Sequence, residues 1–358
     1  MGTAGTQPEF VRSRFSHGTG HDGWPHLRTN SRTSRATSGN VRDLRILLVV
    51  NAFASSVTAR NTVVVHRELS QRHEVEIVET NRRGHATRFA QDAARRGLDV
   101  VIGFGGDGTL NEVATGVAGT STALGVLPGG STNVFARTIG LENDPVRAVR
   151  QLVSGIDAHD IEPIGLGRVN GRYFCFHTGV GYDAAVVNEV EKHSSLKRWL
   201  GHPLFIYASL RTLMSHYDRT SPHFSVSGPT GDQPPGWFQV PDGYFTIVLN
   251  TNPYTYLGNR PLDLSPAATL DRGLVAVTFR TMRLRAVLGS VVGALRGGGV
   301  QTSEHLDVHT DLSTFTVRHD TPFPYQVDGD YLGETRELAF THVPDAVQLV
   351  RPAPMTPT

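Results

Sequence analysis

The sequence predicts two folded parts: an N-terminal Rossmann-like βα domain with a parallel sheet, and a C-terminal antiparallel β-sandwich. Apolar runs alternate with helical patterns over about residues 45–138, which is typical of a parallel sheet with helices on both faces. After about residue 160, short strand-like runs follow one another, separated by Gly, Pro and Asp. Asn170-Gly171 lies between two of these runs and is a strong hairpin-turn signal.

The elements of the first part follow from its periodicity. Strands are expected over residues 46–50, 74–79, 100–104 and 124–127, and helices over 58–72, 85–96, 110–116 and 133–138. Polar and glycine-rich segments come directly after the strands. Because ligands of such sheets bind outside the carboxyl ends of the strands, we expect these segments to meet at one ligand-binding edge.

In the second part, strands are expected over residues 165–169, 172–177, 224–227, 244–250, 274–279, 306–310 and 314–318. A final strand is expected over 338–340 or 346–350. A helix over 192–213 carries Lys197, Arg198, Trp199 and a long apolar face. That face can pack on the sandwich or lie in a membrane interface, and packing is the more usual role of an amphipathic stripe.

Composition excludes several classes of protein. The 358 residues carry a formal charge of +1, which argues against binding to nucleic acid. No run approaches the 18 or so apolar residues of a membrane span. The single cysteine, Cys175, excludes an internal disulfide and is expected inside a strand. Residues 1–42 are rich in Ser, Thr, Gly, Arg and His, and we interpret them as a disordered tail or an overlong gene start.

The glycine cluster at residues 105–109 lies between a buried strand and a helix. Its glycines let backbone N–H groups converge at the positive end of that helix, where an anion binds. Thr109 and Glu112 have the spacing of a capping box. A tight turn would explain the glycines, but Asp107 would repel a phosphate unless a cation such as Mg²⁺ lies between them.

Gly105-Gly106-Asp107-Gly108-Thr109 resembles the nucleotide-binding signature of the diacylglycerol kinase catalytic domain superfamily. This superfamily includes bacterial lipid kinases and sphingosine kinases and, more distantly, NAD kinases. Further matches occur in the expected order at residues 50–51, 80, 84–86, 127–136, 179–183 and 327–330. The segment from Leu127 to Ala136 is characteristic of the lipid-kinase branch, so the chain is identified as similar to bacterial diacylglycerol kinases.

The resemblance implies that ATP binds to the loops of the first part. The nucleotide-binding candidates are Asn51, Thr80, Gly105, Gly106, Asp107, Gly108, Thr109, Leu110, Asn111, Glu112, Gly129, Ser131, Thr132 and Asn133. From the residues alone, Ser131 and Thr132 can equally be helix N-caps. The resemblance also implies that the last strand returns to the first domain. The expected boundaries are a tail over 1–42, a nucleotide-binding domain over 43–160, a lipid-acceptor domain over 161–335 and a C-terminal segment over 336–358.

The candidate proton acceptors are Asp328 and Asp330, which flank a glycine in a segment that also fits an ordinary hairpin turn. In related bacterial lipid kinases the motif is usually Asp-Gly-Glu, and the acid after the glycine is the proposed base. Here that residue is Asp330, one methylene shorter, so the choice between the two acids stays open. Asp107 completes the catalytic candidates.

Asp107 is also the candidate Mg²⁺ ligand. The family has an accessory Mg²⁺ site in a loop that corresponds to residues 270–274. Arg272 occupies the position of the family's ligand, so this second site would depend on Asp271 as a substitute.

Together these features predict an ATP-dependent lipid kinase that phosphorylates a lipid hydroxyl, with diacylglycerol as the leading acceptor and phosphatidic acid as its product. The alternatives are a kinase of sphingoid or other lipids, an NAD-kinase-like enzyme with a soluble substrate, and a non-enzymatic nucleotide- or lipid-binding regulator. We expect a lipid substrate, no nucleic acid and transient contact with a membrane surface, and leave a homodimer open. The expected location is the cytoplasm, with peripheral association at the inner membrane face.

Overall fold

The computed structural model describes residues 43–192, 221–230 and 236–354. The helices and strands up to residue 192 are β1 (Arg45–Val50), α1 (Ala59–Ser70), β2 (Glu74–Glu79), α2 (His85–Arg95), β3 (Val100–Gly105), α3 (Asp107–Val117), β4 (Ala123–Pro128), α4 (Val134–Thr138), α5 (Pro145–Asp157), β5 (Ile161–Val169), β6 (Arg172–Phe174), β7 (His177–Gly181) and α6 (Tyr182–Lys192). Those that follow are β8 (Phe224–Pro229), β9 (Trp237–Gly243), β10 (Phe245–Leu249), β11 (Thr255–Leu257), β12 (Arg260–Leu262), β13 (Leu274–Phe279), α8 (Leu284–Leu295), β14 (Leu306–Leu312), β15 (Thr314–Val327) and β16 (Asp330–Val350).

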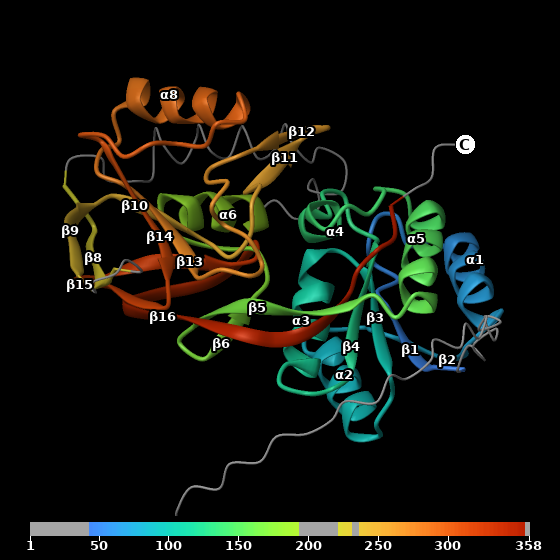
Figure 1. Cartoon of the computed structure of the whole chain (residues 1–358). Helices are drawn as coiled ribbons and strands as arrows, with labels where there is room; N and C mark the ends of the chain where they lie inside the picture. The colour runs from blue at the N-terminus through green and yellow to red at the C-terminus, as the bar shows by residue number, and fades with distance from the viewer. Residues whose placement is uncertain (1–42, 193–220, 231–235, 355–358) are drawn as a thin grey trace, which may run out of the picture. The chain divides into compact units, whose positions relative to one another are not determined.

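The first part is the predicted βα domain. Strands β2, β1, β3 and β4 pair in parallel in that order, and α1, α2, α3 and α5 cover the faces of the sheet (Figure 1). Both β3 and β4 are buried along their whole length, which explains their continuous apolar sequences. The predicted bounds of the first four strands agree with the structure to within one residue.

Helix α3 begins earlier than its sequence predicts. It starts at Asp107, three residues before the expected start at Leu110, and its N-cap is Gly106, without a side-chain cap. Thr109 is therefore inside the helix, and the predicted capping box of Thr109 and Glu112 is wrong. The Thr-x-x-Glu spacing of a capping box also occurs by chance inside the first turns of a helix. There the Thr and Glu side chains can form hydrogen bonds with other elements.

The second part consists of antiparallel strands, as predicted. Asn170 (φ 46°) and Gly171 (φ 87°) form the expected turn between β5 and β6. Strand β15 pairs with β8 near its start and with β7 near its end, so it joins two layers of strands. The predicted strand around Cys175 ends earlier, because β6 stops at Phe174 and Cys175 lies buried in the bend before β7.

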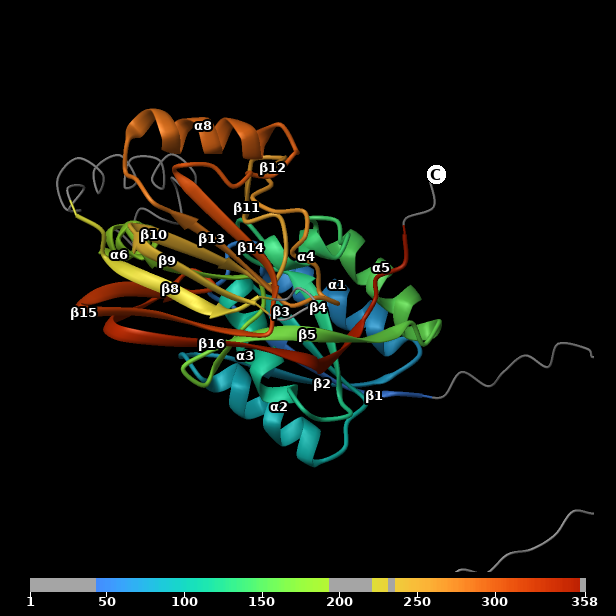
Figure 2. The same ribbon diagram turned by 60° about the vertical axis from the view of Figure 1, so that its left-hand side comes forward.

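The last strand connects the two parts. β16 starts at Asp330, pairs with β15 and then with β5, and near its end pairs in parallel with β4 through Gln348 and Leu349. Within the described residues, hydrogen bonds therefore link fourteen strands in one sheet that includes β1 to β4. Figures 1 and 2 show β16 extending from the β layers toward the helices of the first part.

Three apolar cores stabilise the described residues. One fills the first part, a second lies between β strands around Phe224, Phe315 and Phe340, and a third lies beneath α8 around Phe245 and Phe279. None of the helices in the described ranges is long and apolar enough to cross a membrane. The predicted tail over 1–42, and the predicted helix over 192–213 apart from its first residue, lie outside the described residues.

Candidate active site

Two loops that follow β3 and β4 lie against each other at the carboxyl edge of the parallel sheet. The N–H of Gly129 donates to the carbonyl oxygen of Gly105 at 2.7 Å. A Cβ on Gly129 would lie 2.7 Å from the Cα of Gly105, so a larger residue cannot enter without moving backbone. The glycines at these positions therefore allow the two loops to approach closely.

Asp107 connects these two loops. Its carboxylate accepts hydrogen bonds from the backbone N–H groups of Val134 (3.0 Å) and Phe135 (3.2 Å), at the start of α4. Burial raises the pKa of Asp107, and the two amides act in the opposite direction. The alternative of Ser131 or Thr132 as the N-cap of α4 is wrong, because the cap position is Asn133 and Asp107 takes the amides.

Glu112 and Thr109 bind to other elements of the first part. The carboxylate of Glu112 accepts from the N–H groups of Gly84 (2.8 Å) and Ala86 (3.0 Å), so it caps α2 instead of α3. The Oγ1 of Thr109 accepts from the side-chain amide of Asn51 at 2.9 Å. The bonds of Glu112 hold the start of α2 against α3, and the bond of Thr109 holds the end of β1 against the glycine loop.

The first of two cavities beside the glycine loop, which we call the arginine cavity, has a volume of about 280 Å³. It contains predicted nucleotide-binding residues together with basic residues that were not predicted. Its lining includes Asn51, Phe53, Thr80, Asn81, Arg82, Arg83, Ala86, Gly108, Thr109, Glu112 and Asp330. The guanidinium groups of Arg82 and Arg83 give this cavity donors for a polyanion, beside the carboxylates of Glu112 and Asp330.

The second, which we call the apolar cavity, has a volume of about 320 Å³ and lies between the loops and the β strands. One wall carries Phe176, Val187, Tyr254 and Leu257. The other carries Gly106, Asp107, Gly108, Gly130, Ser131, Thr132 and Val134, and the floor includes His177, Asp328, Gly329 and Asp330. Gly108 and Asp330 line both cavities, so the two meet at these residues.

Asp328 is a buried acceptor with many donors. Its carboxylate accepts from the side-chain amide of Asn111 (2.8 Å) and from the backbone N–H groups of Cys175 (2.7 Å), Phe176 (3.1 Å) and His177 (3.1 Å). Burial raises its pKa to about 7, against the lowering effect of these donors. Asp328 therefore holds α3 and the bend before β7 against the turn that begins β16.

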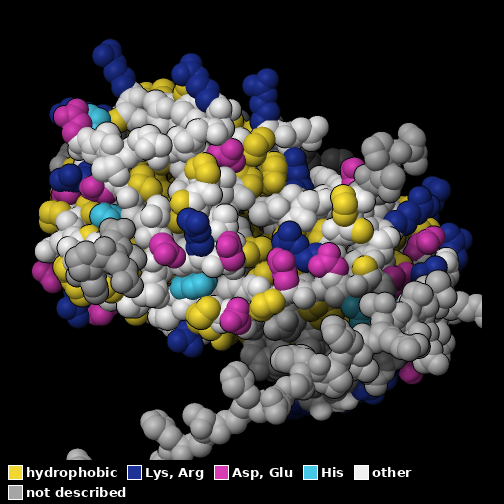
Figure 3. Space-filling view, in the orientation of Figure 1, with side chains coloured by type: hydrophobic (Ala, Val, Ile, Leu, Met, Phe, Trp, Pro, Cys, Tyr) yellow, Lys and Arg dark blue, Asp and Glu magenta, His cyan; other side chains and the backbone are white. Residues whose placement is uncertain are grey.

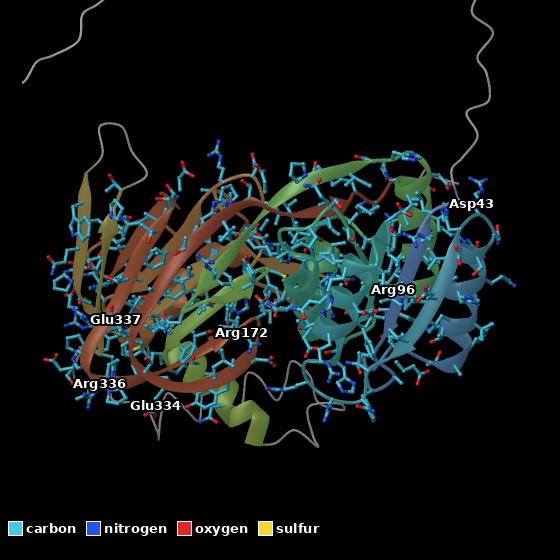
Figure 4. All side chains as sticks on the ribbon, turned by 90° about the horizontal axis from the view of Figure 1, so that it is seen from below. Asp43, Arg96, Arg172, Glu334, Arg336 and Glu337 are labelled. Carbon is cyan, nitrogen blue, oxygen red and sulfur yellow. The ribbon has the colours of Figure 1, made fainter. Side chains whose placement is uncertain are left out.

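Asp330 is in a different environment, two residues further along the same turn. Its side chain is 29% exposed and pairs with Arg83 from the first part and Arg172 from β6, each at 3.3 Å. In Figure 4, Arg172 lies between the β strands and the helices of the first part. Asp330 thus reaches the junction of the two cavities with its carboxylate beside two cations.

A buried network supports the turn from behind, and the sequence did not predict it. The hydroxyl of Tyr254 donates to Asp183, and the side-chain amide of Gln326 donates to the other oxygen of Asp183 at 2.8 Å. The oxygen of Gln326 accepts from the N–H of Gly329 at 2.8 Å. Asp183 belongs to a segment that resembles the family, but Arg83, Arg172 and Gln326 have no local sequence signal.

The remaining predicted residues lie around these cavities. Gly105, Leu110, Asn111, Gly129 and Asn133 line neither cavity and instead support the loops. The side-chain oxygen of Asn133, for example, accepts from the N–H of Gly130 at 2.7 Å.

The donors in this region do not fit a magnesium site built by the protein. Among the described residues, no group of three or more His, Cys, Asp or Glu side chains could hold a metal ion. Both oxygens of Asp107 accept backbone amides, and Asp271 lines neither cavity. The roles of Asp107 and Asp271 as metal ligands therefore stay predictions.

The buried groups His177 and Asp328 should make the stability depend on pH in opposite directions. Burial lowers the pKa of His177 to about 4, so the unfolded chain binds a proton that the folded chain does not between pH 4 and 6.5. Its contribution to stability is complete above about pH 6.5 and is lost as the pH falls toward 4. The raised pKa of Asp328 has the reverse effect, since the folded chain keeps its proton up to about pH 7.

We therefore expect His177→Phe to show the effect of Asp328 without compensation. The free energy of unfolding of this variant should fall by on the order of 4 kcal/mol between pH 4 and 7, relative to a much flatter wild-type curve. Urea unfolding at a series of pH values measures both curves. Phe keeps the ring contacts with Phe176 and Tyr254, so parallel curves for the two proteins would contradict the expectation.

The fold and the two adjoining cavities define a class of two-part protein, in which glycine-rich loops of an α/β domain face an apolar cavity of a β domain. The model of the diacylglycerol kinase catalytic domain matches residues 45–169. The diacylglycerol kinase of Bacillus subtilis is 33% identical over 254 residues, 70% of this chain and 77% of the relative. The chain belongs to the diacylglycerol kinase family, in agreement with the branch predicted from its motifs.

Two further comparisons cover more of the chain. A Pseudomonas aeruginosa protein named "Probable lipid kinase YegS-like" is 28% identical over 312 residues, 86% of this chain and 95% of the relative. The "Crystal structure of a putative diacylglycerol kinase from Bacillus anthracis str. Sterne" has a TM-score of 0.66 at 20% identity, and covers 86% of this chain and 96% of its own. This likeness confirms the predicted fold class.

Proposed function

We propose that the protein is an ATP-dependent lipid kinase that transfers the γ-phosphoryl group to a lipid hydroxyl, with diacylglycerol as acceptor and phosphatidic acid as product. One observation carries the proposal. The arginine cavity and the apolar cavity meet at Gly108 and Asp330, so a polyanion in one and an apolar molecule in the other would place their reactive ends together. Family membership and the name of the Bacillus subtilis relative support the same reaction.

The nucleotide would bind with its phosphates toward the start of α3. Backbone N–H groups at that helix end favour negative charge, and Gly108 has no side chain to exclude it. Arg82 and Arg83 line the same cavity and can neutralise phosphate oxygens. Magnesium, if used, would arrive on the nucleotide's own phosphates, as this ion often does in kinases.

The lipid would bind with its acyl part against Phe176, Val187 and Leu257 and its hydroxyl toward Gly108. The hydroxyl oxygen attacks the γ-phosphorus while the bond to the bridging oxygen of the leaving ADP breaks. Asp330 lies at the junction of the cavities and accepts the hydroxyl proton, since the oxygens of Asp328 already accept four N–H groups. This arrangement favours Asp330 over Asp328 as the base.

A Gly108→Ala variant tests where the reaction takes place. Among the described residues, no atom lies within 4 Å of the Cβ that this change would add, so the fold should tolerate it. We expect the free energy of unfolding to change by less than about 1 kcal/mol, because Ala is the better helix former. Transfer from labelled ATP to diacylglycerol in mixed micelles should fall at least roughly a hundredfold, because the methyl group occupies the space between the two substrates.

Gly298→Ala, in the segment after α8, serves as the control, because Gly298 has no positive φ that would strain a side chain. A Cβ there also meets no atom of the described part of the chain within 4 Å, and the activity of this variant should stay at the wild-type level. Full activity in Gly108→Ala would contradict the proposed site. Transfer by the wild-type protein to NAD or to a sphingoid base, with none to diacylglycerol, would replace the proposed acceptor.

A further inference from the structure

Helix α8 presents an apolar stripe to solvent. Leu284, Leu288, Val292 and Leu295 are between 37% and 52% exposed, and their spacing of four, four and three residues places them on one side of the helix. The neighbouring side of the helix is buried, since Val287, Val291 and Ala294, about a quarter turn away, pack on the core beneath. The apolar surface of α8 therefore continues from its buried face into solvent, and such a contiguous exposed apolar stripe indicates a binding face.

Arginines flank this stripe at both ends of the helix. Arg283 and Arg285 lie at its start and Arg296 at its end, and all three are exposed. The sequence contains no acidic residue from Thr281 to Ser303. Figure 3 shows basic side chains projecting outward beside apolar ones along the edge that carries α8. Aliphatic side chains with arginines at both ends of the helix match the surface of a bilayer that contains anionic phospholipid.

The same helix is attached to a wall of the apolar cavity. The N–H of Asp263 donates to the carbonyl oxygen of Ala294 at 3.1 Å, next to the end of β12. β12 pairs with β11, whose residues Thr255 and Leu257 line the cavity. Figures 1 and 2 both place β12 beside one end of α8. A surface bound to α8 would therefore lie near the strands that form the apolar wall.

We infer that α8 is the docking face of this protein on anionic lipid bilayers, with the apolar stripe inserted below the headgroups and the three arginines against lipid phosphates. The inference rests on the proposed function where it connects the face to a lipid acceptor. A second copy of the chain fits this face less well, because pairing two such helices would bring arginines against arginines.

Flotation of the full chain with vesicles tests the inference. The apolar variant combines Leu284→Gln, Leu288→Gln and Val292→Gln, and the arginine variant combines Arg283→Gln, Arg285→Gln and Arg296→Gln. The matched control combines Val63→Gln and Arg67→Gln on α1, which are similarly exposed. Vesicles of phosphatidylcholine with phosphatidylglycerol should bind the wild type and the control, and added salt should weaken that binding.

We expect the apolar variant to bind these vesicles about tenfold or more weakly, and the arginine variant roughly a hundredfold more weakly. Vesicles of phosphatidylcholine alone should bind the wild type weakly. Wild-type binding by both variants would overturn the inference. So would a change from dimer to monomer in the apolar variant with vesicle binding unchanged, because the stripe would then be an interface between copies.

A second assay keeps docking separate from the proposed reaction. Phosphorylation of a short-chain diacylglycerol in solution requires no bilayer, so both α8 variants should match the wild type. If the wild type phosphorylates no lipid while both variants lose vesicle binding, the proposed function fails and the docking face remains. If the wild type phosphorylates diacylglycerol and both variants bind vesicles normally, the docking face fails and the proposed function remains.

Discussion

Replacing Asp330 by Asn is expected to lower the rate of phosphoryl transfer roughly a hundredfold to ten-thousandfold, because a positioned base contributes about that much. The free energy of unfolding should change by less than about 1 kcal/mol, since the carboxylate is partly exposed and its pairs with Arg83 and Arg172 lie near the surface. Single-turnover transfer from labelled ATP, together with urea unfolding, measures the two quantities on one preparation.

The matched change Asp328→Asn should instead have its main effect on the free energy of unfolding. Its side-chain NH₂ group would face N–H donors that now bind a carboxylate, so we expect a loss of roughly 3–5 kcal/mol in unfolding free energy. Nucleotide binding by the fraction that folds should remain close to that of the wild type. A stable Asp328→Asn protein without transfer activity, beside an active Asp330→Asn protein, would make Asp328 the base.

Replacing Asp107 by Ala is expected to lower both the free energy of unfolding and the affinity for nucleotide. The N–H groups of Val134 and Phe135 would lose their acceptor in a buried place, at a cost of roughly 2–4 kcal/mol. Without these two bonds the loop after β4 is held to the loop after β3 only by the contact between Gly129 and Gly105, so nucleotide affinity should fall about tenfold or more. Calorimetric titration with an ATP analogue and thermal unfolding measure these effects.

Asp144→Ala is the control for this change. Asp144 caps α5 by accepting from Val146 and Arg147, both at 3.0 Å, in an exposed position. Its loss should cost about 1 kcal/mol and leave nucleotide affinity unchanged. If Asp107→Ala were as stable as the wild type and lost its magnesium dependence, Asp107 would be a metal ligand, as its position in the glycine loop predicts.

Local sequence patterns were sufficient to predict most of the fold. The βα alternation was predictable because each strand of the first part is a continuous buried run, bounded by polar residues and glycines. The turn at Asn170-Gly171 was predictable because both residues must adopt positive φ. The early start of α3 was not, since Gly106, Asp107 and Gly108 are poor helix formers and the second loop holds Asp107 through the N–H groups of Val134 and Phe135.

The sequence predicted the loops of the candidate site, but it did not predict the long-range side-chain contacts that join them. Glu112 has the spacing of a local cap, but it caps a helix that begins 27 residues earlier, at His85, and sequence spacing cannot distinguish the two. The partners of Asp330 lie 247 and 158 residues away. Such contacts depend on the tertiary fold, so Arg83, Arg172 and Gln326 carry no signal in a single sequence.

The position of β16 has a consequence for synthesis on the ribosome. One edge of β4 pairs with Gln348 and Leu349 of β16. The ribosome makes β4 more than two hundred residues before it makes these two. Until those last residues emerge, the nascent βα domain exposes an unpaired, apolar strand edge of the kind that promotes aggregation. Nascent chains of this protein should therefore depend on chaperones until Gln348 and Leu349 have emerged, and deletion of the segment that pairs with β4 should affect the solubility of the first domain as well as the second.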